Sequence, residues 1–217
     1  MTFEPIQQAD LSLQVYQQIR NMILSGELKP GEKLPQEKIA DQLGVSRMPL
    51  HKAFVRLEEE FLVESIPRRG IFIRKHDLRE IIEAFECREG LEGIAARRAA
   101  ENLSENDIDY LEELFSPFSK DMPIDTFRYQ EADQKFHEAI IQFSGNRIMH
   151  KLNRIGNVLI GTYPKGIILP LEESLEDHAN IIQAFRSRDI QKAEELIRLH
   201  SRKAINILNE ELIQEGK

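Results

Sequence analysis

The sequence has one cysteine, no long apolar run and no recognisable secretory signal. A single Cys87 excludes an internal disulfide framework and is typical of a reducing compartment. No stretch of about 18 apolar residues occurs, so no membrane-spanning segment is expected. The start, MTFEPIQQADLSLQ, lacks a basic region followed by an apolar region. We therefore expect a cytoplasmic protein, and we expect Cys87, which falls in a helical pattern, to be a small core residue.

An excess of positive charge is also missing. The 217 residues include 29 Lys+Arg and 37 Asp+Glu, a net charge of −8, which argues against nucleic-acid binding by the whole surface. The charge is unevenly distributed, because residues 1–75 carry 11 basic and 10 acidic side chains and residues 76–217 carry 18 and 27. Two segments of different electrostatic character predict two domains, 1–75 and 76–217. The hydrophobic content of 41% is that of an ordinary globular protein.

The first segment reads as three helices and a hairpin. LSLQVYQQIRNMIL has apolar residues at helical spacing, with Ser12 as a candidate N-cap. Two shorter helices fit QEKIADQLG and SRMPLHKAFVRLEEEF, and Gly44 permits a tight turn between them. After them, β-branched and aromatic residues on either side of PRRG predict two strands joined by a turn.

Two short helices followed by a hairpin with a basic tip are typical of a winged helix-turn-helix, whose second helix enters the DNA major groove. Basic side chains occur where such a domain contacts DNA, on the opening turns of the second helix and in the hairpin turn. The candidate DNA-binding residues are Arg47, His51, Lys52, Arg68, Arg69 and Gly70. The alternative is a small helical domain with solvated charges.

The second segment reads as helices alone, so the predicted fold is mainly α, a winged helix-turn-helix followed by an antiparallel bundle of about six helices. Asp77 and Ser104 are candidate N-caps. The helical patterns and their breaks place the helices at 77–102, 104–116, 126–144, 146–162, 171–187 and 189–214.

A group of polar residues lies on the apolar faces of three of these helices. Asp133 and His137 are four residues apart and share one face, and His178 and His200 have apolar neighbours at helical spacing. Imidazoles and a carboxylate converging inside a bundle suit a divalent transition metal, Zn, Ni, Fe or Mn. The alternative is a set of hydrogen-bonded core histidines beside a solvated i, i+4 pair. His150 is expected at the surface.

The segment GVSRMPLHKAF resembles the recognition helix of the GntR family of bacterial transcription regulators, which typically reads G-V-S-R-T-P-V-R-E-A-L, and PRRG resembles the family's P-x-x-G wing. The resemblance covers nearly all of residues 11–75. It implies that Arg47 reads or grips DNA and that Arg69 and Gly70 form the wing tip. His51 and Lys52 replace the usual Arg-Glu. Phe61 replaces the glycine that usually ends the helix, and Phe adopts a left-handed cap poorly.

Residues 77–212 are similar to the helical effector domain of the FadR subfamily, in its VanR-like branch with six helices. The D-x-x-F-H pattern of DQKFH, the later Asp-His pair and the histidine of the last helix carry the resemblance. It implies that Asp133, His137, His178 and His200 bind one divalent metal ion. It also implies that Arg88, in CREGLEGIAARRAA, faces a cavity for a small organic acid, and that a homodimer binds a double-stranded DNA operator.

Three functions are compatible with these patterns. The first is a transcription regulator that senses a small carboxylate beside a metal ion. The second is a metal-dependent enzyme that uses the Asp/His₃ set, although no motif supplies a separate general base or nucleophile and the DNA-binding domain would be unexplained, so we expect no enzyme. The third is a direct metal sensor, and a permanently bound structural metal is the alternative to the first and third.

Overall fold

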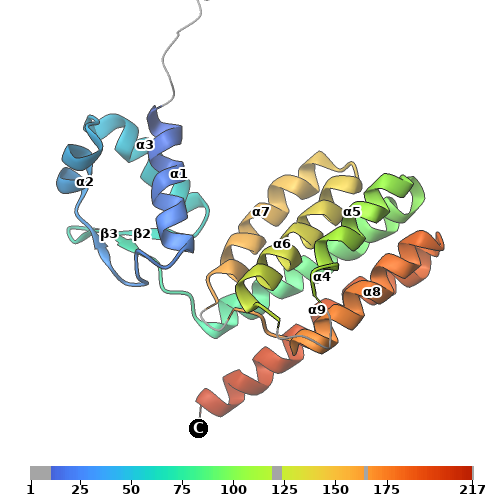
Figure 1. Cartoon of the computed structure of the whole chain (residues 1–217). Helices are drawn as coiled ribbons and strands as arrows, with labels where there is room; N and C mark the ends of the chain where they lie inside the picture. The colour runs from blue at the N-terminus through green and yellow to red at the C-terminus, as the bar shows by residue number, and fades with distance from the viewer. Residues whose placement is uncertain (1–10, 119–123, 164–165, 217) are drawn as a thin grey trace, which may run out of the picture. The chain divides into compact units, whose positions relative to one another are not determined.

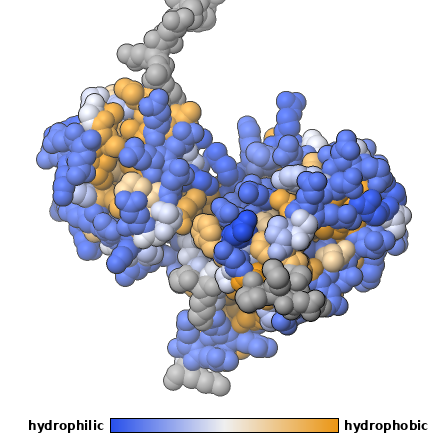
Figure 2. All heavy atoms as spheres, in the orientation of Figure 1, coloured by the Kyte–Doolittle hydropathy of each residue, from blue (hydrophilic) through white to orange (hydrophobic). Residues whose placement is uncertain are grey.

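The computed structural model describes residues 11–118, 124–163 and 166–216, and the chain divides into two compact units, Met1–Lys75 and His76–Lys217. Helices and a small sheet build the first unit, and helices build the described part of the second (Figure 1). Hydrophilic side chains cover most of the visible surface of each unit (Figure 2). None of the helices in the described ranges combines the length and apolar character that crossing a bilayer requires. The mainly α fold is therefore confirmed.

The first unit contains the predicted helix-turn-helix and hairpin. Its helices are α1 (Leu11–Leu24), α2 (Gln36–Leu43) and α3 (Arg47–Glu59), and its strands are β1 (Lys33–Leu34), β2 (Val63–Ile66) and β3 (Gly70–Ile73). The strands form an antiparallel sheet in the order β1-β3-β2. The short strand β1 was not predicted, because only its pairing with β3, as Leu34 opposite Ile71, defines it. Ser12 lies inside α1 and does not precede it.

The turn between α2 and α3 has the geometry that the sequence predicts. Gly44 follows α2 in the left-handed conformation (φ 64°), and its N–H donates to carbonyls of the preceding turn. Ser46 occupies the N-cap position of α3, but its side chain makes no capping hydrogen bond. Leu50, Phe54 and Leu57 are buried on one side of α3, which leaves the opposite side of this helix exposed.

Phe61, immediately after α3 and its cap, adopts a left-handed conformation with φ 61°. This conformation costs a residue with a Cβ atom roughly 1–2 kcal/mol. The neighbouring Glu60 is buried and accepts a hydrogen bond from the Tyr16 hydroxyl (2.7 Å), which holds the end of the helix in place. Phe61 is 37% exposed, and the centroid of its ring lies 4.8 Å from Arg74 Cζ.

We expect Phe61→Gly to raise the free energy of unfolding by about 0.5–1 kcal/mol, because glycine removes the strain but adds flexibility to the unfolded chain. Urea denaturation measures the change. Phe61→Ala is the control, because it removes the ring but keeps a Cβ atom in the same conformation, and it should bring no gain. Lower stability of Phe61→Gly would mean that the ring contact with Arg74 outweighs the strain.

The second unit is a helical bundle with six helices in its described residues. They are α4 (Leu78–Asn102), α5 (Glu105–Phe115), α6 (Thr126–Phe143), α7 (Arg147–Gly161), α8 (Leu171–Arg186) and α9 (Ile190–Glu215). The predicted ends of these helices agree within one residue. Asp77 and Ser104 both form capping boxes with the residue three positions later, as expected. Helix α4 packs against α9, α7 and α6, and its small buried residues Ala95, Ala96 and Ala99 let these neighbours approach closely.

The prediction that Cys87 is a core residue is wrong, because its side chain is exposed. The buried face of α4 passes instead through Ala84, Arg88 and Glu92. Arg88 and Glu92 are charged, so α4 buries polar side chains as well as apolar ones on this face. The spacing of apolar residues alone therefore does not identify the buried face of α4.

Candidate metal centre and nucleic-acid interface

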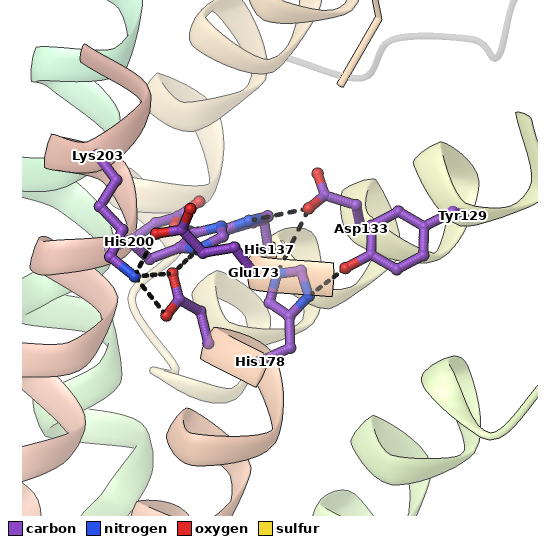
Figure 3. Close-up of polar contacts among 9 residues, drawn as sticks. Tyr129, Asp133, His137, Glu173, His178, His200 and Lys203 are labelled. Carbon is purple, nitrogen blue, oxygen red and sulfur yellow. Dashed lines mark hydrogen bonds and ion pairs between the residues drawn. The ribbon is translucent and has the colours of Figure 1, made fainter. Parts of the chain in front are cut away.

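The Asp133 and His137 side chains of α6 meet His178 of α8 and His200 of α9 inside the helical unit. One ligand atom from each of the four residues lies within 4.8 Å of the others. Figure 3 shows the imidazoles and the carboxylate gathered at one place. The three histidines are buried, and the Asp133 side chain is 22% exposed. His150 is exposed, as expected.

Each of these three imidazoles is held through its Nδ1 atom by a side chain outside the cluster. Such outer contacts fix the orientation of a ring and leave Nε2 as the nitrogen available to a ligand. The contacts are His137 Nδ1 to Glu92 Oε2 (2.6 Å), His178 Nδ1 to Tyr129 Oη (3.2 Å) and His200 Nδ1 to Asp177 Oδ2 (3.1 Å).

The Nε2 atoms of His137 and His178 are buried and have no hydrogen-bond partner among the described residues. Asp133 Oδ1 lies 3.7 Å and 3.4 Å from them. A buried polar atom without a partner is costly and rare. Ligands bonded to one ion at about 2.1 Å lie roughly 3 to 4.2 Å apart, so side-chain movements below about 1 Å would close the cluster around a cation. The residues therefore fit a divalent metal ion.

The charges around the cluster shift the pKa values of its residues in ways that bear on metal binding. Burial is the largest influence on Asp133 and acts to raise its pKa, but His137, through its charge and a hydrogen bond, and the Arg88 cation outweigh burial and hold the pKa well below the usual value. Burial lowers the pKa of His178 well below its ordinary value, and charge on His200 adds to this effect. At Asp133 and His178 these shifts favour an ionised carboxylate and a neutral imidazole, the forms that bind metals. Burial acts to lower the pKa of His137, but the carboxylates of Glu92 and Asp133 outweigh it and raise this pKa, so a metal ion bound at His137 would displace a proton.

A cavity lies beside the four residues. Arg88, the predicted effector-binding residue, is buried, and it lines this cavity together with Asp133 and His200. Its Nη2 donates to Asn157 Oδ1 (3.2 Å), and its Nε lies 3.3 Å from Glu92 Oε1. The other lining residues are Phe85, Gln130, Gln134, Ile160, Gly161, Gly166, Ile167, Ile168, Leu169, Ser174 and Ala204, besides Asn157. A cation, a carboxylate, three amides and apolar side chains thus surround one space.

The sequence reading missed the residues that hold the imidazoles, Glu92, Tyr129 and Asp177. Their positions relative to the predicted site residues could have identified them. Glu92 is four residues after Arg88 on the same helix face, Tyr129 is four residues before Asp133, and Asp177 is next to His178. Glu92 is fully buried and contacts both His137 and Arg88. It therefore links the metal-ligand candidates to the cavity.

The candidate DNA-binding residues lie in the first unit and are accessible. Arg47, His51 and Lys52 are exposed on α3, and Arg47 Nη2 donates to Glu37 Oε1 of α2 (2.6 Å). Arg68 and Arg69 lie in the turn between β2 and β3, and Gly70 is the first residue of β3. Arg68 and Gly70 have positive φ values (64° and 105°). Arg69 lies over the Phe72 ring at 5.4 Å. Basic side chains therefore occur at both places where a winged helix-turn-helix meets DNA.

Known proteins share both units. Residues 11–73 match the model of the gntR family of bacterial regulatory proteins, and residues 83–203 match the FCD domain. The uncharacterized HTH-type transcriptional regulator YdhC of Bacillus subtilis is 31% identical over 150 residues, 68% of this chain and 67% of YdhC. The probable D-xylose utilization operon transcriptional repressor of Paenarthrobacter nicotinovorans is 28% identical over 196 residues, 86% of this chain and 85% of that protein.

The same organisation occurs in a solved structure. E. coli McbR/YncC matches with a TM-score of 0.73 and 25% identity, covering 94% of this chain and 100% of that one. The order of the two family matches along the chain also agrees with the two compact units. The chain therefore belongs to the gntR family of bacterial regulatory proteins, as a DNA-binding transcription regulator with an FCD domain.

Proposed function

We propose that this protein is a homodimeric cytoplasmic regulator whose FCD domain binds a divalent metal ion and a small organic acid, and that the acid changes the affinity for a DNA operator. The observation that carries the proposal is the convergence of three oriented imidazoles and Asp133 beside a cavity that contains Arg88. A homodimer supplies the two reading helices that a two-fold symmetric operator requires.

Asp133, His137, His178 and His200 would hold the metal ion, each histidine through Nε2. Nitrogen and carboxylate ligands without a thiolate favour Zn, Ni, Fe or Mn. A bound ion would supply positive charge and a position for an oxygen ligand. The protein's own contribution is the orientation of the rings by Glu92, Tyr129 and Asp177.

The chemistry of the cavity supports a small carboxylate as the effector. The Arg88 guanidinium can pair with a carboxylate through two N–H groups. Its present partners, Glu92 and Asn157, keep it in place. Apolar residues on the cavity wall, among them Phe85 and Ile160, favour a ligand with an apolar portion.

A direct metal sensor is the second candidate, because the four candidate ligands include three buried imidazoles. The two candidates differ in what changes operator affinity. Double-stranded DNA selected from a random pool by the purified protein provides the probe, and binding is measured with and without a chelator across a panel of organic acids. We expect one class of acid to shift operator affinity only in metal-loaded protein. A shift on metal removal alone, with no response to any acid, would favour the sensor.

The DNA-binding assignment predicts two distinct mutational effects. Arg47→Ala should weaken binding to the selected DNA by roughly 1–3 kcal/mol if Arg47 contacts a base. Arg69→Ala should weaken binding to all sequences more evenly and reduce the dependence on salt concentration. Fluorescence anisotropy at several salt concentrations measures both effects. Parent-like binding by both variants would mean that the recognition helix and the wing are misassigned.

A further inference from the structure

Met48 is an apolar residue that points away from the core of the first unit. It is the second residue of α3, and its side chain is 65% exposed. Leu57, nine residues later on the same helix, is fully buried. Nine residues correspond to about 180° around a helix axis, so Met48 lies directly opposite Leu57. The side chain at the centre of the exposed side of α3, in its first turn, is therefore a thioether.

The residues around Met48 are basic. His51 and Lys52 are exposed one turn later, on either side of the direction in which Met48 points. Arg47 precedes Met48, and its guanidinium contacts Glu37 of α2 at 2.6 Å, which draws it toward α2. Basic side chains contact phosphates and the polar edges of bases. Met48 carries no charge and no hydrogen-bond donor, so it needs a different, apolar contact in the same ligand.

A single exposed methionine among cations does not suit a protein partner. Val55, the other large apolar residue exposed on α3, is seven residues later, and Lys52 lies between the two. Protein interfaces bury roughly 800 Å² on each partner, and charged residues are depleted at their centre. DNA fits better, because the major groove offers polar base edges together with one apolar group, the C5-methyl of thymine.

The position of Met48 along α3 also suits a contact with a base. In a helix-turn-helix the N-terminal residues of the second helix contact the base edges. Met48 lies in the first turn of α3, whereas Val55 lies about 10 Å further along the axis. Methionine is unbranched and has three rotatable bonds, so its side chain can follow a methyl group in the groove.

We infer that Met48 recognises a thymine in the operator by packing its thioether chain against the C5-methyl group in the major groove. This inference rests on the proposed role of α3 as the helix that enters the groove. It makes Met48 a residue that determines sequence specificity through an apolar contact, beside the polar contacts proposed for Arg47. The two copies of α3 in the proposed homodimer would contact one such thymine in each half-site.

Replacing thymine with uracil tests the contact, because it removes the C5-methyl group and leaves base pairing unchanged. The probe is double-stranded DNA selected from a random pool by the purified full-length protein, with each thymine replaced in turn. One thymine in each half-site should be sensitive, and its replacement should weaken binding of the parent by roughly 4-fold, the effect of one buried methyl group. Replacement in both half-sites should weaken binding by about 16-fold, since the two contacts are independent.

Three variants assign the sensitivity to a side chain. Met48→Ala lacks the chain that reaches the methyl group, so its affinities for thymine and uracil DNA should agree within about 1.5-fold. Met48→Leu keeps an apolar side chain of similar volume and should retain a difference of about 2-fold or more. Val55→Ala is the matched control, because it shortens an exposed apolar residue outside the first turn of α3, and it should keep the sensitivity of the parent.

The outcomes separate this inference from the assignment of α3. Parent protein that binds thymine and uracil DNA equally would overturn the thymine contact, and so would Met48→Ala with the sensitivity of the parent. Loss of sensitivity in Val55→Ala alone would assign the methyl contact to Val55 and overturn the role of Met48. In each of these cases weaker binding by Arg47→Ala would leave α3 as the recognition helix. Parent-like binding to the selected DNA by both Arg47→Ala and Met48→Ala would overturn the helix assignment as well.

Discussion

The His178→Ala variant is expected to bind divalent metal at least about 100-fold more weakly than the parent and to lose its stabilisation by metal, because it removes one of the four candidate ligands. A metal ion at about 100 times its dissociation constant stabilises the parent by roughly 2.7 kcal/mol. Thermal unfolding with and without Zn, Ni or Mn measures this difference. Elemental analysis of protein purified without chelator or an affinity-column metal measures the metal content. The response of DNA binding to acids should be lost as well, while the DNA-binding unit stays folded.

His150→Ala is the matched control, since it removes an exposed histidine outside the cluster and should leave metal binding unchanged. The DNA-binding unit of His178→Ala is checked by binding to non-specific DNA at low salt, which needs no effector. Parent protein with fewer than about 0.2 ion per chain, and no stabilisation on adding any of the three metals, would contradict the proposed site. The four residues would then be core histidines beside a carboxylate.

Glu92→Ala is expected to lower the free energy of unfolding by about 3–5 kcal/mol, the range for breaking a buried charged pair. Glu92 is fully buried, and its carboxylate contacts His137 Nδ1 at 2.6 Å and Arg88 Nε at 3.3 Å. Removing the carboxylate leaves the Arg88 cation without its buried counter-charge and His137 without the group that orients its ring. Urea denaturation of metal-free protein measures the loss.

Two further variants show which property of Glu92 matters. Glu92→Gln keeps the shape and an oxygen acceptor but removes the charge, and we expect it to weaken metal binding by about 10- to 100-fold while costing less stability than alanine. Glu89→Ala is the matched control one turn earlier on α4, where the carboxylate pairs with the exposed Arg202. Glu89→Ala should change the free energy of unfolding by no more than about 1 kcal/mol. Equal losses of unfolding free energy for Glu89→Ala and Glu92→Ala would show that the buried contacts of Glu92 stabilise the protein no more than an exposed ion pair does.

The sequence alone determined the features that depend on near neighbours along the chain. Helix periodicity and local capping placed the six helices of the second unit, and the capping boxes at Asp77 and Ser104 form from residues three apart. The turn at Gly44 depends on a single backbone conformation. Asp133 and His137 were visible as a pair because one helical turn separates them. The FadR-type pattern added His178 and His200, which do lie beside them.

Only the tertiary structure decided which face of α4 is buried and what each imidazole contacts. Glu92 and His137 are 45 residues apart, and Tyr129 and His178 are 49 apart, so no local pattern pairs them. The need for contacts between distant residues also explains why strand β1 was not predicted, since it exists through its pairing with β3. It likewise explains why Cys87 was wrongly expected in the core. The inward positions of Arg88 and Glu92 are stabilised by partners from other helices, and these partners override the apolar spacing of α4. Local interactions thus set the elements, whereas long-range contacts between buried polar groups set the site.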